Sequence, residues 1–158
     1  MTDVMKIITI RPAGKDDYTR AEALLMQVQE LHVRLRPDLY QPVSRILSPE
    51  EFTALADQQH ILLAETEEQV AGLVWFSVRH IENPIQKTRN VLHLDAMVVD
   101  EPFRRQGIAR QLLTHVKRMA EAGYDGFELQ VNAANDAARK LYAEFGFTEK
   151  SINMELHG

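Results

Sequence analysis

The segment VVDEPFRRQGIARQLLTHV, residues 98–116, holds the residue types best suited to chemistry in this chain. An apolar run ends at a proline turn, two adjacent arginines follow, and Gly107 precedes a pattern typical of an amphipathic helix. The first N–H groups of a helix have no intrahelical partner and lie at the positive end of its dipole, so a tight turn there can hold phosphate. Gly107 has no Cβ to block a close approach, and Ala109 keeps the next inward position small. The segment therefore predicts an anion site, with positive charge from Arg104, Arg105 and Arg110.

A lone glycine turn is a weaker signal than a dinucleotide fingerprint, because it lacks the G-x-G-x-x-G spacing, and no P-loop lysine follows it. Two other interpretations stay open on these residues alone. One is a plain strand-to-helix turn with solvated arginines, and the other is a general α/β nucleotide binder.

Composition limits the classes of partner. The chain has 158 residues, a net charge of −5 and no cysteine. The acidic balance argues against a nucleic-acid binder, and the lack of thiols excludes an acyl-cysteine intermediate and fits a reducing compartment. The start shows no signal-peptide pattern, and no stretch approaches the roughly 20 apolar residues of a membrane span. We therefore expect a cytoplasmic protein that binds neither nucleic acid nor membrane, and, since the six histidines show no ligand spacing, no metal.

Periodicity predicts the elements that must position this turn. Strands are expected at residues 6–11, 60–66, 69–80, 91–99, 127–131 and 147–156, with a polar loop around Asn83, Pro84 and Asn90. Helices are expected at residues 18–35, from Ser48 onward with Ser48 and Glu51 forming a capping box, at about 106–122, and at 135–145. Hairpins and a strand-helix-strand crossover in one chain indicate a single α/β domain with a mixed sheet.

Two spaced motifs carry a resemblance to a known family. Arg104-x-x-Gly107-x-Ala109, after the strand AMVVDEPF and before a helix, resembles the acetyl-CoA signature Q/R-x-x-G-x-G/A of the GCN5-related N-acetyltransferases (GNAT). The segment NDAARKLYAEFGFTEK resembles that family's second hallmark, and IRPAGKDD resembles its first strand and turn. The resemblance spans nearly the whole chain. It implies one acyl-CoA N-acyltransferase domain over residues 1–158, with a mostly antiparallel sheet of six to seven strands, helices on both faces, and a splay between residues 91–99 and 127–131.

The resemblance also implies where acetyl-CoA, the acyl donor, would bind. The pantetheine arm would pair with the backbone of Met97, Val98 and Val99. The pyrophosphate would lie on the turn, formed by Arg105, Gln106, Gly107, Ile108 and Ala109, with Arg104 and Arg110 near the phosphates. Asn132 and Asn135 fall where the family places polar contacts to CoA, although a helix cap is an equal alternative for Asn135.

Family resemblance gives Tyr142 the role of the general acid that protonates the departing thiolate. Asp95 falls where many members place an acidic residue that acts as a base, directly or through water. His93 has the same strand parity, so both side chains are expected on one face of the sheet. From the residues alone, a core tyrosine and a salt-bridged aspartate remain alternatives.

The acceptor side is expected at the end of the first long helix, the loop after it and the hairpin strands. This nominates Leu35, Arg36, Leu39, Tyr40, Trp75, Phe76, His93 and Asp95. Aromatic rings suit an amine stem or a cationic head, although a core role for Trp75 is the stronger alternative. The net charge of −5 does not distinguish a small-molecule amine from a peptide amine as the acceptor.

The function expected from these residues is N-acetyl transfer from acetyl-CoA to a primary amine, directly within a ternary complex, since no thiol can carry the acyl group. A sensor module that binds acyl-CoA without turnover is the alternative. By analogy with the family, the protein is expected to form a homodimer.

Overall fold

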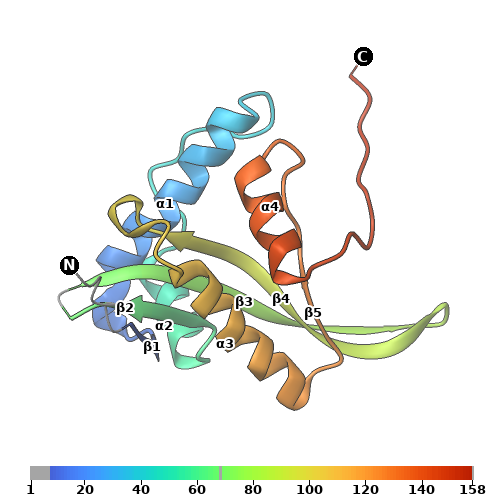
Figure 1. Ribbon diagram of the computed structural model, residues 1–158, viewed down its shortest axis with the longest axis horizontal. Coiled ribbons are helices and arrows are strands. Elements are labelled where there is room, and N and C mark those ends of the chain that lie inside the picture. Colours follow the sequence, from blue (N-terminus) through green and yellow to red (C-terminus); the bar gives the residue numbers. More distant parts are fainter. Residues whose placement is uncertain (1–7, 68, 158) are drawn as a thin grey trace, which may run out of the picture.

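The computed structural model describes residues 8–67 and 69–157 and shows a five-stranded sheet with helices on both faces (Figure 1). This confirms the mixed α/β class. The strands are β1 (Thr9–Pro12), β2 (Ile61–Glu65), β3 (Val70–Asn83), β4 (Gln86–Val99) and β5 (Gly126–Leu129). The helices are α1 (Tyr18–Leu35), α2 (Pro49–Asp57), α3 (Ile108–Gly123) and α4 (Asp136–Phe145). Residues 6 and 7 of the first predicted strand lie outside the described residues.

The strands follow the order β1-β2-β3-β4-β5. The first four are antiparallel neighbours, and β5 returns parallel to β4 after α3. The prediction of a polar loop around Asn83, Pro84 and Asn90 is wrong, because β3 and β4 each run for 14 residues and form a long hairpin arm. The Asn83 side chain explains the tight turn, since its Oδ1 accepts hydrogen bonds from the N–H groups of Ile85 and Gln86 at 3.0 and 2.9 Å.

The predicted number of six to seven strands is also wrong, since the described sheet has five. The predicted last strand, residues 147–156, forms no regular secondary structure, and this segment runs outward from α4 (Figure 1). Its sequence alternates as a strand should, but a strand needs a neighbouring edge with which to form hydrogen bonds. Within the described part of the chain, β5 is the last strand and pairs only with β4.

The helix boundaries follow the expected capping signals. Ser48 Oγ accepts from the Glu51 N–H at 3.1 Å, and the Glu51 carboxylate accepts from the Ser48 N–H at 3.2 Å, so the capping box is confirmed. Gly146 adopts φ +120° directly after α4, a conformation that ends the helix and that glycine adopts most easily. No described helix has the length and apolarity required to cross a membrane.

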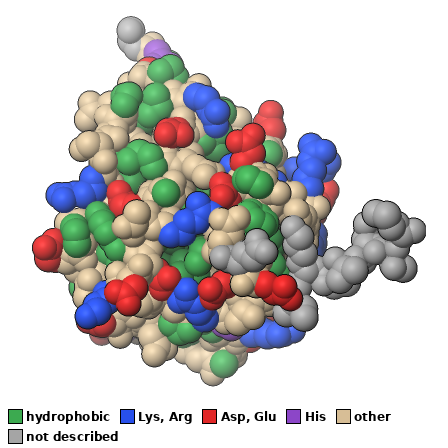
Figure 2. Space-filling model, turned by 90° about the vertical axis from the view of Figure 1, so that its left-hand side faces the viewer, with side chains coloured by type: hydrophobic (Ala, Val, Ile, Leu, Met, Phe, Trp, Pro, Cys, Tyr) green, Lys and Arg blue, Asp and Glu red, His purple; other side chains and the backbone are tan. Residues whose placement is uncertain are grey.

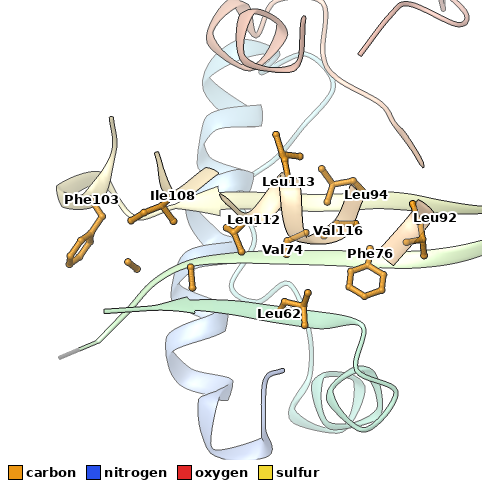
Figure 3. Packing of buried hydrophobic residues seen from close by; sticks show 13 residues of the cluster. Leu62, Val74, Phe76, Leu92, Leu94, Phe103, Ile108, Leu112, Leu113 and Val116 are labelled. Atoms are coloured by element: carbon orange, nitrogen blue, oxygen red, sulfur yellow. The ribbon is translucent and has the colours of Figure 1, made fainter. Parts of the chain in front are cut away.

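Two apolar clusters cover the two faces of the sheet. On one face, α1 and α2 pack on the strands through Leu24, Leu25, Phe52, Ile61, Leu63 and Leu73. On the other face, Leu112, Leu113 and Val116 of α3 point toward Val74, Leu94 and Phe76 (Figure 3). Gly72 lets α3 begin close to the strands, since a Cβ there would lie 3.1 Å from the Val98 carbonyl oxygen and 3.3 Å from Ile108 Cγ2. The packing of α3 therefore fixes the turn that precedes it.

Leu112→Ala should lower the free energy of unfolding by about 2–5 kcal/mol, because Leu112 is fully buried and its truncation leaves a cavity between α3 and the sheet. Urea denaturation measures the change. Gln111→Ala, on the exposed side of the same helix, is the matched control and should change stability by less than about 0.5 kcal/mol. Equal effects of the two substitutions would contradict the packing described here.

Candidate active site

Strands β4 and β5, the last two strands of the described sheet, part along their length. Their parallel ladder ends at the pair Leu94 and Leu129, whereas β4 continues to Val99 beside β3. Asp100 N–H bonds to the Ala71 carbonyl at 2.8 Å, and antiparallel alternation then turns the backbone groups of Met97 and Val99 away from β3. The predicted splay is confirmed, and it leaves strand-like backbone groups facing the gap.

A β-bulge lies at Asp95, where the two strands part. The register steps from Trp75 opposite Ala96 to Phe76 opposite Leu94, so Asp95 has no partner on β3. A bulge twists the strand and changes the direction of a side chain. It brings the expected pair together, with His93 Nε2 3.8 Å from Asp95 Oδ1. This distance is longer than a direct hydrogen bond and leaves the carboxylate available to another donor.

His93 is the one buried polar residue of the described chain, with 6% of its surface exposed. Its Nδ1 has no hydrogen-bond partner among the described residues. Burial lowers its pKa below the usual value and the charge of Arg79 acts in the same direction, while Asp95 and Glu128 oppose the shift. The imidazole is therefore neutral at pH 7 and can accept a proton.

The turn before α3 has the backbone shape of an anion nest. Arg105 and Gly107 have φ values of +64° and +82°. The first helical hydrogen bond runs from Gln111 N–H to the Gly107 carbonyl, so the preceding N–H groups have no acceptor within the helix. A Cβ built on Gly107 would meet nothing within 4 Å, so the space before this backbone is open. The left-handed conformation of Arg105 carries no signal in the sequence.

Asp100 fixes this turn to α1. Its carboxylate accepts from Arg20 Nη2 at 2.6 Å and from Gln27 Nε2 at 2.8 Å. The same side chain caps the short helix Glu101–Phe103 by accepting the Glu101 N–H at 2.9 Å. These bonds hold the pKa of Asp100 below its usual range. Sequence analysis missed this positioning cluster, because residues so far apart along the chain leave no spacing signal.

The arginines of the turn differ in direction. Arg104 lies along the surface beside β4, where its Nε donates to the Val99 carbonyl at 3.0 Å and its Nη2 donates to Gln27 Oε1 at 3.3 Å. The Arg110 guanidinium lies 6.0 Å from the centre of the Phe145 ring. Arg105 and Gln106 are exposed. A surface hollow of about 360 Å³ begins at this turn and follows α3, lined by Gly107, Arg110, Gln111, Thr114, His115, Arg118 and Ile10 of β1.

Tyr142 lies on α4 and packs against the same cluster as Met97 and Leu129, residues from the strands on the two sides of the gap. Its ring meets Phe147 edge-on at 5.7 Å. Burial raises the pKa of Tyr142 to about 12, and the hydroxyl makes no hydrogen bond to any described residue. The phenol is therefore protonated at neutral pH and available as a donor.

The two asparagines before Tyr142 shape the start of α4. Asn132 Oδ1 accepts from the Ala134 N–H at 2.9 Å, and Asn135 Oδ1 accepts from the Ala138 N–H at 3.1 Å. The expected cap at Asn135 is thus present. Neither side-chain amide N–H group bonds to the described residues, so both remain available as donors.

The expected acceptor residues divide between the two faces of the sheet. Trp75 packs with Ala96 on the sheet face covered by α1 and α2. Phe76 is buried on the opposite face under α3, so it cannot line an acceptor site on the α1 and α2 face. At the end of α1, Leu35 is half-buried and Leu39 is exposed. The Tyr40 ring lies 4.8 Å from that of His32. Arg36 pairs with Asp38 at 2.8 Å and with Glu155 at 2.5 Å.

The sheet thus parts beside a bulged strand, and an anion nest follows the end of that strand. The sequence model of the Acetyltransferase (GNAT) family matches residues 25–147. The chain belongs to this family.

Curated relatives agree with this membership. An N-acetyltransferase of Bacillus subtilis, YycN, is 31% identical over 123 residues, which cover 70% of this chain and 73% of that protein. The [ribosomal protein bS18]-alanine N-acetyltransferase of Escherichia coli is 39% identical over 57 residues, 35% of this chain. That match spans only 38% of the Escherichia coli protein.

Solved structures share the fold. A point mutant of the BH1408 protein of Bacillus halodurans superposes with a TM-score of 0.89 at 27% identity, covering 94% of this chain and 98% of that one. The aminoglycoside N-acetyltransferase AAC(6')-Iy, solved in complex with CoA, superposes with a TM-score of 0.65 at 19% identity, covering 100% and 99%.

The stability of the wild type should fall more steeply below neutral pH than that of His93→Gln. A lowered folded-state pKa means that the unfolded chain binds a proton first, so stability declines as the pH falls from about 6.5 toward the folded value. Urea denaturation at about pH 7.5 and about pH 5.5 measures the difference. Arg79, Asp95 and Glu128 are common to both proteins and serve as the internal control. An equal loss of stability in both would contradict the buried neutral imidazole.

Proposed function

We propose that this protein is an N-acetyltransferase that moves an acetyl group from acetyl-CoA to a primary amine by direct transfer in a ternary complex. One observation carries the proposal. The part of β4 that lacks a β5 partner runs from the bulge at Asp95 to Val99, the nest at Gly107 follows it after the short helix Glu101–Phe103, and Tyr142 packs against the same gap. Family membership supports the donor, and a solved relative holds CoA.

The proposed donor site follows that edge. The amides of the pantetheine arm would bond to the backbone of Met97 and Val99 as an added strand does, with Val98 between them. The pyrophosphate would occupy the nest formed by residues 105–109, where unpaired N–H groups and the dipole of α3 favour negative charge. The free amide N–H groups of Asn132 and Asn135 would supply further donors. Arg105 and Arg110 have exposed side chains that would contact the phosphates, whereas the Arg104 side chain donates a hydrogen bond to the Val99 carbonyl of β4.

The proposed chemistry needs one base and one acid. Asp95, directly or through water, would take a proton from the acceptor ammonium, and neutral His93 beside it would favour that transfer. The amine nitrogen then forms a bond to the thioester carbonyl carbon, and the carbon–sulfur bond breaks. Tyr142 would donate its proton to the departing sulfur, because its raised pKa keeps the phenol protonated.

The proposed acceptor enters from the opposite face, where Leu35, Tyr40 and Trp75 lie on the α1 side of the sheet. The relatives support an amine, since one acts on an aminoglycoside and another on the alanine of a ribosomal protein. Acidic and basic side chains are interspersed on the face seen in Figure 2, which offers no continuous basic surface for a nucleic acid. We propose a small-molecule or peptide amine.

We further propose that residues 1–158 form one domain of this kind and that it acts in the cytoplasm as a homodimer. Coverage of 94% of the chain by a solved relative supports the single domain. The lack of cysteine fits a reducing compartment.

Gly107→Asp should weaken acetyl-CoA binding at least several-fold, because it adds a negative charge where the pyrophosphate would approach. Any side chain is strained at φ +82°, so Gly107→Asn is the matched control with the same shape and no charge. Isothermal titration should rank the affinities as wild type, then Gly107→Asn, then Gly107→Asp. Unchanged affinity in Gly107→Asp would refute the donor placement.

Tyr142→Phe should keep acetyl-CoA affinity but lower kcat by about 10²-fold, since it removes only the proton donor. Tyr124→Phe, in the same apolar cluster, is the control and should keep full turnover. Steady-state kinetics and titration separate the two effects. Full activity in Tyr142→Phe would refute the acid role. Tight acetyl-CoA binding by the wild type without turnover of any amine would instead favour the sensor.

A further inference from the structure

Strands β4 and β5 carry polar side chains on the face of the sheet opposite α3. His93 and Glu128 are direct partners in the parallel ladder, so their side chains share one face. Leu92 and Phe127, one residue earlier on each strand, pack in the cluster under α3. Alternation therefore turns His93 and Glu128 to the other face, the one from which the acceptor amine enters in the function proposed above.

The Glu128 carboxylate lies close to the proposed base. Burial lowers the pKa of His93 and Arg79 acts in the same direction, while Asp95 and Glu128 both oppose the shift, so both carboxylates lie near the imidazole. The Glu128 side chain is 24% exposed. The ladder continues for only one residue beyond it, to Leu129, before the strands part. A cation at Glu128 therefore lies beside the opening at which acetyl transfer is proposed.

The chain places one of its own amines at this carboxylate. Lys150 Nζ donates to Glu128 Oε1 at 2.5 Å, and Arg89 Nη2 donates to the same oxygen at 3.3 Å. The hydrogen bond from Lys150 is the main reason that the pKa of Glu128 lies below its usual range, and Arg89 adds to the effect. The Lys150 side chain is 62% exposed, so its stem has room to change direction.

Phe147 anchors the segment that carries Lys150. Its ring lies 5.1 Å from that of Phe127 and 5.7 Å from that of Tyr142, and its N–H donates to the Tyr142 carbonyl at 2.9 Å. Lys150 follows only three residues later. The anchor therefore keeps the lysine amine at β5, on the acceptor side of the gap.

We propose that Lys150 is a self-acetylation site, at which the chain transfers an acetyl group from bound acetyl-CoA to its own lysine amine. The inference rests on the proposed function. A strand rises by about 3.3 Å per residue, so Asp95 lies at most roughly 7 Å along β4 from the row of His93 and Glu128. The flexible four-carbon stem of lysine spans such a distance by rotation. Because the amine is tethered beside the opening, it does not have to be captured from solution.

The step balances with the groups already described. The Lys150 ammonium gives one proton to Asp95, directly or through water, and its nitrogen bonds to the thioester carbonyl carbon. The nitrogen loses a second proton as the carbon–sulfur bond breaks, and Tyr142 protonates the departing sulfur. The products are N-acetyllysine at position 150, free CoA and one proton. The neutral amide no longer pairs with Glu128, which keeps Arg89 as its partner.

A plain surface ion pair is the competing interpretation of Lys150, and Lys117 of α3 is its matched control. Lys117 Nζ lies 3.6 Å from Glu121 Oε1, and its side chain is 55% exposed. It extends over the Phe145 ring of α4, on the other face of the sheet from His93. Acetyl-CoA that reacts from solution should modify the two lysines alike, whereas transfer within the site should select Lys150.

The test is peptide mass spectrometry of the full-length protein during incubation with acetyl-CoA and no added amine. Lys150 should gain one acetyl group at least tenfold faster than Lys117, at a rate that saturates with acetyl-CoA. The rate constant should not change with protein concentration, because the reaction is intramolecular. Lys150→Arg, which keeps a cation at Glu128 but offers no amine, should show only the slow background at Lys117 and the other lysines.

Equal rates at Lys150 and Lys117 would overturn the proposal, as would a Lys150 rate that rises in proportion to acetyl-CoA without saturation. A rate constant that rises with protein concentration would place the transfer between molecules and also overturn it. Thiol release with added amines, measured in parallel, tests the transferase separately. Amine-dependent release with Lys150 unmodified refutes self-acetylation alone, whereas the absence of both reactions and of acetyl-CoA binding refutes the proposed function as well.

Discussion

The parting of β4 from β5 is the constraint on which the rest of the site depends. A parallel pair of strands ordinarily satisfies its facing backbone groups along the whole ladder, but here the ladder ends at Leu94 and Leu129. The bulge at Asp95 coincides with this point and changes the twist of β4. The backbone groups of Met97 and Val99 that point away from β3 therefore favour a ligand with amides of its own, with the Val99 carbonyl also accepting from Arg104 Nε. The bulge lies beside His93 and Asp95 at the point where the strands part.

The site is held by packing on one side and by hydrogen bonds on the other. The absence of a side chain at Gly72 allows α3 to lie close to β3 and β4. This close packing fixes the position of the nest, which lies at the N-terminus of α3. The Asp100 carboxylate ties the same turn to Arg20 and Gln27 of α1. Because both attachments involve elements already fixed in the two apolar clusters, the nest is preformed, which reduces the entropic cost of binding an anion.

Local signals allowed most elements to be predicted, and long-range contacts explain the failures. The capping box at Ser48 and the stop at Gly146 are encoded in a few neighbouring residues, and so is the glycine turn at Gly107. The bulge at Asp95 and the bonds of Asp100 arise from residues distant along the chain, so periodicity could not reveal them. The last predicted strand failed because alternation in residues 147–156 describes the two faces of a strand and carries no information on whether the segment pairs with an edge, and the described residues leave the outer side of β5 unpaired. Phe76 was nominated with Trp75, although adjacent strand residues face opposite sides of the sheet.

Release of free CoA thiol from acetyl-CoA, measured with a thiol reagent across polyamines, aminoglycosides, amino acids and short peptides, tests the central claim most directly. The protein has no cysteine and contributes no signal of its own. The account predicts thiol release that depends on one class of amine and saturates with both substrates. No release with any amine, together with no binding of acetyl-CoA in a titration, would contradict the assignment of the gap between β4 and β5 as an acetyl transfer site.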